Sequence, residues 1–286
     1  MTIEIGNEKN SPIIRIMQEN ELEDFLDLME ISFKESLETD RINLTEMRNI
    51  IKKSYKPFFK LMMKIMQVKM KNYVVELDGK MVSGISLSIE KDEGNIGNVM
   101  THPDYRRKGF ARTLFQLANK QAEESKIKKM DLSVNANNVG AIELYESEGF
   151  KRNYHSGVFE FKQIRKFSEV ENYLVTIKEI KHIEFENMDK MLDDCFPSFY
   201  FETRNRKKFI KKYIPSKFIQ AIAKRIAGQI IRTYGFFLNG DEQPRGYIQT
   251  SKSRAEENIR LNSPILLEKD NDLLIEAFPQ LIKLES

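Results

Sequence analysis

A basic turn that contains glycine separates a predicted strand from a predicted helix, and its residue types suit anion binding. Residues 96–101 are strand-like, residues 106–109 read Arg-Arg-Lys-Gly, and a helical pattern of apolar residues begins at Phe110. A helix N-terminus presents unpaired N–H groups and a partial positive charge. Cationic side chains beside it favour a pyrophosphate, and Gly109 permits close backbone approach. The sequence predicts an anion site here, with a solvated basic turn as the alternative.

A tyrosine suited to proton donation follows in a second predicted strand–helix unit. Residues 130–134 are strand-like, residues 135–138 read Asn-Ala-Asn-Asn, and a short helical segment ends at Gly149. Asparagine before a helix and glycine after it are typical start and stop signals. Inside this segment, Tyr145 carries a phenol that stays protonated at neutral pH and can protonate a leaving group. The alternative is a buried tyrosine bonded to a carbonyl.

Together the two segments resemble the GNAT superfamily of N-acetyltransferases. The family's R/Q-x-x-G-x-G/A motif is matched by Arg106, Gly109 and Ala111. Its N-x-x-A-x-x-L-Y-E-x-x-G-F signature is matched by Asn138, Ala141, Leu144, Tyr145, Glu146, Gly149 and Phe150. Both motifs stand in the family's order, with room between them for one helix and one strand, and the resemblance covers residues 12–163.

The resemblance implies a fold and a set of cofactor contacts. We expect a mixed, V-shaped sheet whose strands splay beside acetyl-CoA, with the pyrophosphate on the backbone of residues 107–112 and the pantetheine arm along residues 99–101. Tyr145 would be the general acid, and backbone N–H groups of residues 99–101 would hold the oxyanion. The predicted cofactor-binding residues are Val99, Met100, Thr101, Arg106, Arg107, Lys108, Gly109, Phe110, Ala111, Arg112, Asn138 and Tyr145.

The general base cannot be assigned from the sequence. Where family members carry a carboxylate on one of two neighbouring strands, this chain has Asn95 or Ser133, and neither is a good base. Glu90 and Glu93 lie nearby and are interpreted as solvated turn charges. A water chain, or an amine that arrives neutral, would then take the place of a base.

The chain also repeats itself. Residues 14–33 align without a gap on residues 177–196, and their apolar residues agree in helical phase. The match continues through amphipathic basic stretches at 57–71 and 215–231. It then reaches Asp-Gly at 78–79 and Asn-Gly at 239–240, which are strong hairpin signals. The basic stretches are predicted to be helices packed on a sheet, including Met62, Met63, Met66 and Met70 as core; a membrane-surface or partner-binding helix is the alternative.

The second copy is predicted to have lost the cofactor site. At an offset of 163 residues, Lys269, Asp272 and Leu274 stand opposite Arg106, Gly109 and Ala111. The acidic run at residues 268–272 would repel phosphate. No counterpart of residues 130–150 follows before Ser286. We therefore predict an α/β (α+β) chain of two GNAT-like domains, each a mixed, mostly antiparallel sheet flanked by helices, with the C-terminal domain truncated.

The predicted domains are an acetyl-CoA-binding GNAT domain at 1–163, a linker at 164–172 and a degenerate GNAT-like domain without a CoA site at 173–286. An accidental similarity to an unrelated α/β domain is the alternative for the second half. We expect acceptor choice to lie in residues 33–72 and in the neighbouring domain, where no motif identifies the acceptor.

Composition limits the remaining classes. Lys and Arg total 46 and Asp and Glu total 43, so the formal net charge is +3, which argues against a dedicated nucleic-acid-binding protein. One cysteine, Cys195, excludes an internal disulfide, and the scattered histidines His102, His155 and His182 predict no metal. No signal-like or membrane-spanning segment stands out, so we expect a soluble, cytoplasmic protein, a monomer or homodimer with no membrane partner.

The leading functional hypothesis is direct transfer of an acetyl group from acetyl-CoA, as co-substrate, to a primary amine on a small molecule or a protein. The rival from another class is a non-catalytic CoA-binding or protein-interaction module, which the missing base and the degenerate second copy favour. Loss of turnover with retained cofactor binding in a Tyr145→Phe variant would separate the two.

Overall fold

The computed structural model describes residues 2–4, 11–39, 42–153, 174–201, 205–255, 259–270 and 272–285. The chain divides into two compact units, Met1–Arg152 and Asn153–Ser286. The linker predicted at 164–172 lies outside the described residues, so its bounds stay a prediction. In the described parts, no helix has the length and apolar character needed to cross a membrane.

The first unit is built on one six-stranded sheet in the order β1-β2-β3-β4-β5-β6. All neighbours are antiparallel except β5 and β6, which pair in parallel. The strands are β1 (Thr2–Glu4), β2 (Ile13–Ile16), β3 (Val68–Leu77), β4 (Lys80–Glu90), β5 (Glu93–Thr101) and β6 (Lys129–Leu132). The sheet is thus mixed and mostly antiparallel, as predicted.

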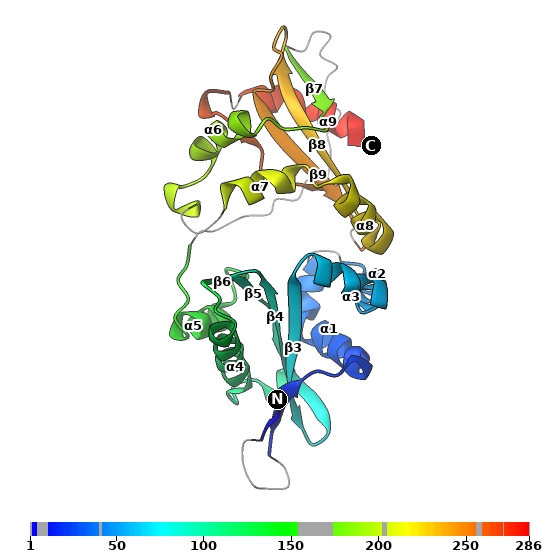
Figure 1. The fold of residues 1–286 in the computed structure, drawn as a ribbon, viewed down its shortest axis with the longest axis vertical. Coiled ribbons are helices and arrows are strands. Elements are labelled where there is room, and N and C mark those ends of the chain that lie inside the picture. The colour runs from blue at the N-terminus through cyan, green and yellow to red at the C-terminus, as the bar shows by residue number, and fades with distance from the viewer. Residues whose placement is uncertain are drawn as a thin grey trace. The chain divides into compact units, whose positions relative to one another are not determined.

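Helices cover both faces of this sheet and divide its core in two (Figure 1). On one face, α4 and α5 pack over Ile85, Leu87 and Ile96; on the other, α1 and α2 pack over Val74 and Met100. The helices are α1 (Leu22–Thr39), α2 (Leu44–Ser54), α3 (Pro57–Ile65), α4 (Phe110–Glu124) and α5 (Val139–Ser147), with short 3-10 turns η1 (Glu19–Glu21) and η2 (Pro103–Tyr105).

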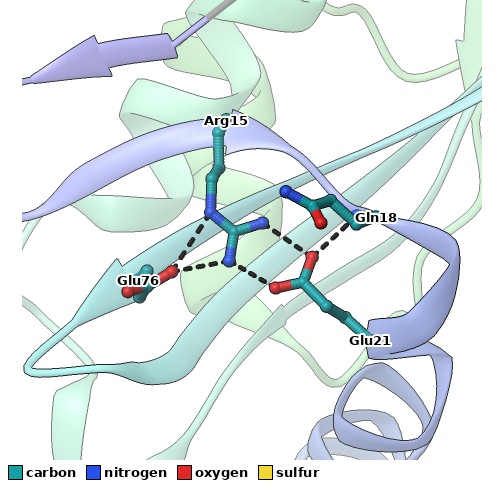
Figure 2. A network of polar contacts seen from close by, with 4 residues as sticks. All are labelled: Arg15, Gln18, Glu21 and Glu76. Carbon is teal, nitrogen blue, oxygen red and sulfur yellow. Dashed lines mark hydrogen bonds and ion pairs between the residues drawn. The ribbon is translucent and has the colours of Figure 1, made fainter.

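A half-buried ion network fixes the start of α1 against the sheet (Figure 2). The guanidinium of Arg15, on β2, donates to Glu21 at 2.6 and 2.5 Å and to Glu76, on β3, at 3.1 and 2.5 Å. Glu21 also accepts the backbone N–H of Gln18 at 2.7 Å. The hydrogen bonds from Arg15 hold the pKa of Glu21 below its ordinary value, so the network stays charged at neutral pH.

The second unit repeats the arrangement with fewer strands. Its sheet has the order β10-β9-β8-β7, with β11 also paired to β9, and the pairings among these described strands are all antiparallel. The strands are β7 (Val175–Glu179), β8 (Ile230–Leu238), β9 (Gly246–Lys252), β10 (Arg260–Leu261) and β11 (Ile265–Leu266). The helices are α6 (Phe185–Cys195), α7 (Arg206–Tyr213), α8 (Lys217–Ala227) and α9 (Asp272–Glu285), with short turns η3 (Ser198–Tyr200) and η4 (Glu268–Asp270).

The predicted repeat agrees with the topology of both units. In each, a strand and a helix are followed by two more helices and a pair of antiparallel strands. Then come β5 in the first unit, or the two short strands β10 and β11 in the second, a 3-10 turn and a helix. In the second unit, α9 packs on one face of the sheet over Phe236 and Ile248. On the opposite face, α6 and α7 pack over Tyr247 and Ile265, as Figure 1 shows. The pair α6 and α9 therefore takes the places of α1 and α4.

The basic stretches differ from their prediction. We expected helix over 57–71 and 215–231, but α3 ends at Ile65 and α8 at Ala227, and strands β3 and β8 start at Val68 and Ile230. Gln67, with φ of 57°, breaks the first helix, and Gly228, with φ of 61°, ends the second. Of the four predicted core methionines, Met62 is buried, whereas Met66 and Met70 are about half exposed.

Candidate active site

Strand β5 leaves the sheet partly unpaired on one side, beside the predicted cofactor site. Its pairing with β6 runs only from Glu93↔Lys129 to Ile96↔Leu132, whereas β5 continues to Thr101. On its other side, the register with β4 shifts between Gly84 and Ser86, and Asn98 has a left-handed φ of 48°. This bulge bends the strand at that point. Among the described residues, the outer edge of residues 97–101 has no strand partner.

The basic turn after β5 exposes a helix N-terminus. Arg107 and Gly109 have positive φ of 63° and 85°, and Gly109 is the N-cap of α4 without a side-chain cap. The first N–H bonded back within the helix is that of Thr113, to the Gly109 carbonyl at 3.1 Å. The N–H groups of Phe110, Ala111 and Arg112 are therefore available to a ligand. A Cβ atom added at Gly109 would have no other atom within 4 Å, so the glycine faces open space.

The cationic side chains of this turn differ in their engagement. Arg106, Arg107 and Lys108 are exposed; Lys108 lies over the Tyr105 ring at 4.9 Å, and Arg106 donates to the Thr101 carbonyl at 3.4 Å. Arg112 instead pairs with Glu148 at 3.2 Å and donates to Ser147 at 3.0 Å. Its side chain joins α4 to the end of α5, so only its backbone N–H is offered to an anion.

Asn138 and Tyr145 both lie on α5. The side-chain oxygen of Asn138 accepts the Ala141 N–H at 3.2 Å and caps the helix, while the residue stays exposed. Tyr145 is 8% exposed and stacks on Phe115 with 5.2 Å between ring centroids. Burial raises the pKa of Tyr145 to about 12. Its hydroxyl has no hydrogen-bond partner among the described residues, which differs from the alternative of a carbonyl-bonded tyrosine.

The three residues predicted on the strand also lie together. Val99, Met100 and Thr101 form the end of β5. Met100 is buried against α1, and the hydroxyl of Thr101 contacts Ser83 at 2.9 Å. Their side chains are thus held by the sheet, which leaves the backbone of the unpaired edge for a ligand.

A carboxylate that the sequence analysis missed lies beside Asn95. The Asn95 amide donates to Asp131, on β6, at 2.6 Å, and the two residues are register partners. Met130 and Leu132 pack into the α4–α5 core, so by strand alternation Asp131 faces the other side of the sheet. Glu90 and Glu93 pair at the β4–β5 turn instead. The carboxylate could have been found only from the parallel register of β5 and β6, which pairs two residues 36 positions apart in sequence. No local motif contains both residues.

A row of polar side chains crosses the sheet on this same face. Asn72 donates to the Tyr55 hydroxyl at 2.6 Å and is the register partner of Ser86, which accepts from Asn98 at 3.1 Å. Asn72 is 9% exposed, and its buried side-chain oxygen has no hydrogen-bond partner among the residues that the structure describes. A buried acceptor without a donor is costly, so this row suits a bound molecule with N–H or O–H groups. Tyr55 and Asn72 belong to the region where acceptor choice was predicted, residues 33–72, whereas Ser86 and Asn98 lie outside it.

No group of three or more potential metal ligands occurs among the described residues. The features described above that could take part in chemistry are an open strand edge, a helix N-terminus with cations, a protonated tyrosine and a carboxylate.

Comparison with known proteins gives a family match and similar enzymes. Residues 44–150 match the model of the acetyltransferase (GNAT) family. The ribosomal protein bS18-alanine N-acetyltransferase of Escherichia coli K12 is 34% identical over 89 residues, which cover 29% of this chain and 60% of that protein. A putative enzyme of the same name from Bacillus subtilis is 28% identical over 88 residues, covering 29% of this chain and 58% of that protein.

The fold of the whole chain has a counterpart as well. A tandem GNAT protein from the clavulanic acid biosynthesis pathway superposes with a TM-score of 0.57 and 14% identity, covering 96% of this chain and 85% of that one. This likeness shows the fold: two GNAT-like units in one chain. These N-acetyltransferases match 29% of this chain, and the chain spans about 60% of their length.

Proposed function

We propose that this chain, whose residues 44–150 match the model of the acetyltransferase (GNAT) family, transfers an acetyl group from acetyl-CoA to a primary amine. The observation that carries the proposal is the uncapped N-terminus of α4, with Gly109 facing open space, next to the unpaired edge of β5. One feature suits a pyrophosphate and the other an extended amide chain, and they adjoin in the order in which acetyl-CoA presents these groups.

The pyrophosphate would bind at the turn. Backbone N–H groups of Phe110, Ala111 and Arg112 would donate to its oxygens, and Arg106, Arg107 and Lys108 would neutralise its charge. The pantetheine arm would pair with the backbone of Val99, Met100 and Thr101 as an added strand. Asn138, at the start of α5, would contact the arm through the amide N–H₂ that its capping role leaves over.

The chemical step is nucleophilic substitution at the thioester. The neutral amine attacks the carbonyl carbon, the C–N bond forms, and backbone N–H groups near Val99 stabilise the oxyanion. The C–S bond then breaks, and Tyr145 gives its proton to the departing thiolate. The attacking nitrogen loses a proton as the amide forms, and a proton from water restores the phenol of Tyr145. Holding amine and thioester in line supplies much of the acceleration.

Asp131 is our candidate for the base. An amine reaches the site mostly as an ammonium ion and must lose a proton before attack. The Asp131 carboxylate can take that proton through water, and the Asn95 amide at 2.6 Å holds it in place. Some family members carry a base at the position of Asn95 on β5. Asp131 is the register partner of that position on the neighbouring strand β6.

The relatives suggest which amine to test first. The similar enzymes are named for the alanine of ribosomal protein bS18, so a peptide with a free N-terminal alanine is the first acceptor to try. The polar row from Tyr55 to Asn98 would hold the backbone of such a peptide, with the Asn72 oxygen accepting one of its N–H groups.

The second unit is proposed to lack a CoA site. Its corresponding turn η4 carries Glu268 and Asp270, and α9 starts at Asp272 in place of a glycine-capped helix. Pyrophosphate would meet carboxylates there.

Calorimetry with acetyl-CoA tests the proposal, followed by release of CoA thiol with a panel of amines. We expect binding by the unmodified protein and a Kd raised more than 100-fold in Gly109→Glu, because the new carboxylate would lie against the phosphates. Gly109→Ala is the matched control, and it should weaken binding about tenfold. A residue with a Cβ atom is strained by roughly 1–2 kcal/mol at the φ of 85° that Gly109 adopts. Absence of acetyl-CoA binding would refute the proposal, whereas binding without turnover on any amine would favour a non-catalytic CoA-binding module.

A further inference from the structure

The second unit contains a cavity of about 370 Å³ that the proposed acetyl transfer does not use. The loop between β8 and β9 forms one wall with Asp241, Glu242 and Arg245, and η4 forms another with Asp270. This loop is longer than its counterpart in the first unit. There, Asp78 and Gly79 alone join β3 to β4; here, residues 239–245 separate β8 from β9.

Asp270 differs from the other residues that line this cavity in the hydrogen bonding of its carboxylate. It is 9% exposed, and its Oδ2 atom is buried without a hydrogen-bond partner in the part of the chain that the structure describes. A carboxylate oxygen removed from water without a donor is energetically costly. A ligand that brings a cationic N–H donor would supply what the chain does not.

The surrounding charges favour such a cation. Arg245 is engaged by Asp241, with 2.7 Å between guanidinium and carboxylate, and this pair raises the pKa of Arg245 and lowers that of Asp241. The charge of Asp270 also contributes to the raised pKa of Arg245, but the hydrogen-bonding partner of this guanidinium is Asp241. Asp270 and Glu242 remain, and they leave the lining with a net charge of two negative units.

The apolar part of the lining defines the rest of the ligand. Met191, 4% exposed, and the partly buried Leu267 also line the cavity. An alkyl chain can lie against these side chains while its charged end reaches Asp270, as long cationic side chains do on protein surfaces. A bare metal ion would gain nothing from them.

The internal repeat relates this cavity to the turn before α4 in the first unit. Turn η4 stands between β11 and α9, as turn η2 stands between β5 and α4 in the first unit. Asp270 therefore lies at the position equivalent to the turn that precedes the proposed pyrophosphate site. The basic residues there are replaced here by an acidic run at 268–272. The second copy has kept the turn and reversed the sign of its charge.

We propose that the second unit binds a primary alkylammonium group in this cavity, with Asp270 as its hydrogen-bonding counter-ion. A free diamine and a lysine side chain present the same chemistry. The site is independent of acetyl transfer and requires no acetyl-CoA.

Calorimetry on the full chain at pH 7.5 and 150 mM salt tests the site with 1,5-diaminopentane and with Nα-acetyl-lysine methylamide. We expect the unmodified protein to bind at least one of them; the diamine alone would indicate a free polyamine, and the lysine derivative a protein side chain. Asp270→Asn should weaken binding more than tenfold. Asp272→Asn, which removes an exposed carboxylate outside the cavity, should change it less than twofold.

Two further measurements keep the result decisive. If Asp270→Asn fails to fold, Glu242→Gln should still weaken binding severalfold. The neutral analogue 1-pentanol should not compete with the diamine. No binding of either amine up to 10 mM would overturn the proposal. So would equal losses in the Asp270 and Asp272 variants, which would indicate diffuse surface attraction, or unchanged binding in Asp270→Asn, which would place the amine elsewhere.

Discussion

Tyr145 is the residue whose environment matches its proposed task most closely. Packing against Phe115 excludes water from the ring, and the resulting rise of its pKa to about 12 keeps the phenol protonated throughout the physiological range. The hydroxyl, without a partner among the described residues, has its proton available. An acid must hold its proton until the thiolate leaves, and burial here secures that.

Replacing Tyr145 with phenylalanine tests the acid directly. We expect kcat to fall about 100-fold, the lower end of the usual contribution of a general acid, with the Kd for acetyl-CoA changed less than twofold. The ring that stacks on Phe115 is retained, so folding should be unaffected. Single-turnover assays of thiol release and calorimetry measure the two quantities. A variant with the full rate would assign Tyr145 a structural role only.

A second substitution at the same scale tests the base. Asp131→Asn keeps the shape of the side chain but cannot accept a proton, so we expect kcat/KM to fall at least tenfold. The matched control is Asp92→Asn, which removes an exposed carboxylate paired with Lys128 and should leave kcat/KM unchanged. An Asp131→Asn variant with the parental kcat/KM would exclude Asp131 as the base.

The residues of the site were predictable to the extent that they belong to local motifs. The turn at 106–111 and the helix around Tyr145 are each contiguous in sequence, so their pattern alone marks them. Asp131 was not, because its neighbour Asn95 lies on another strand and only the parallel register brings the two together. The unsatisfied oxygen of Asn72 likewise follows from packing that no spacing encodes.

At the scale of elements, the two predicted hairpins show what a short signal can and cannot decide. Asp78 and Gly79 have φ of 52° and 72°, as a two-residue turn with two left-handed residues requires, and this prediction is confirmed. The Asn-Gly prediction at 239–240 is wrong in its length. Gly240 has φ of 93°, but Asn239 does not adopt positive φ, and β9 starts only at Gly246. The loop's further contacts, among them Arg245 with Asp241, override the local preference.

The helices predicted at 57–71 and 215–231 were too long for a related reason. Apolar residues at 62, 63, 66 and 70 fit a helix, but Met70 lies on β3, where alternation applies. Periodicity cannot locate the residue at which a helix gives way to a strand. One left-handed residue, Gln67 or Gly228, makes that change, and glutamine carries no signal for it.

The Arg15 network allows a prediction about how these elements are joined. Arg15→Gln would leave Glu21 and Glu76 as two half-buried carboxylates without their shared donor, and we expect a loss of about 2 kcal/mol in the free energy of unfolding. The control is Lys128→Gln, whose exposed ion pair with Asp92 should contribute nothing measurable. Urea unfolding followed by circular dichroism gives both values. Equal stability of the two variants would show that the Arg15 network does not contribute.

At the scale of the whole molecule, the repeat was predictable because several blocks recur in one order. Strand order and the helix on each face agree between the two units, and the tandem GNAT fold covers nearly the full chain. The cavity of the second unit could not be foreseen. It depends on the longer β8–β9 loop, whereas the sequence showed only that the acidic run at 268–272 was unsuited to phosphate.

Both units contain tyrosines that make stability sensitive to alkaline pH. Burial raises the pKa of Tyr73, Tyr145 and Tyr247 to about 12, and also raises that of Tyr213 and Tyr234. Unfolded tyrosines lose their protons near pH 10, so above that pH the unfolded chain binds fewer protons than the folded one. The stability from these groups is complete below pH 10 and is lost as the pH rises toward 12.

Urea midpoints at pH 8, 10 and 11 measure this effect, and we expect them to fall between pH 10 and 11. Tyr247→Phe, which keeps the buried ring, should show a shallower fall than the parent chain. An identical fall in both would assign the alkaline sensitivity to other groups.

The unpaired edge of β5 has a consequence for the protein outside its reaction. An exposed strand edge is a template onto which another extended chain can add, and residues 97–101 contain no proline and have no strand partner among the described residues. Acetyl-CoA bound along residues 97–101 would occupy the same hydrogen-bonding groups. The cofactor would then protect the molecule from self-association. Light scattering of the concentrated protein should accordingly rise when the cofactor is removed and fall again when CoA is returned.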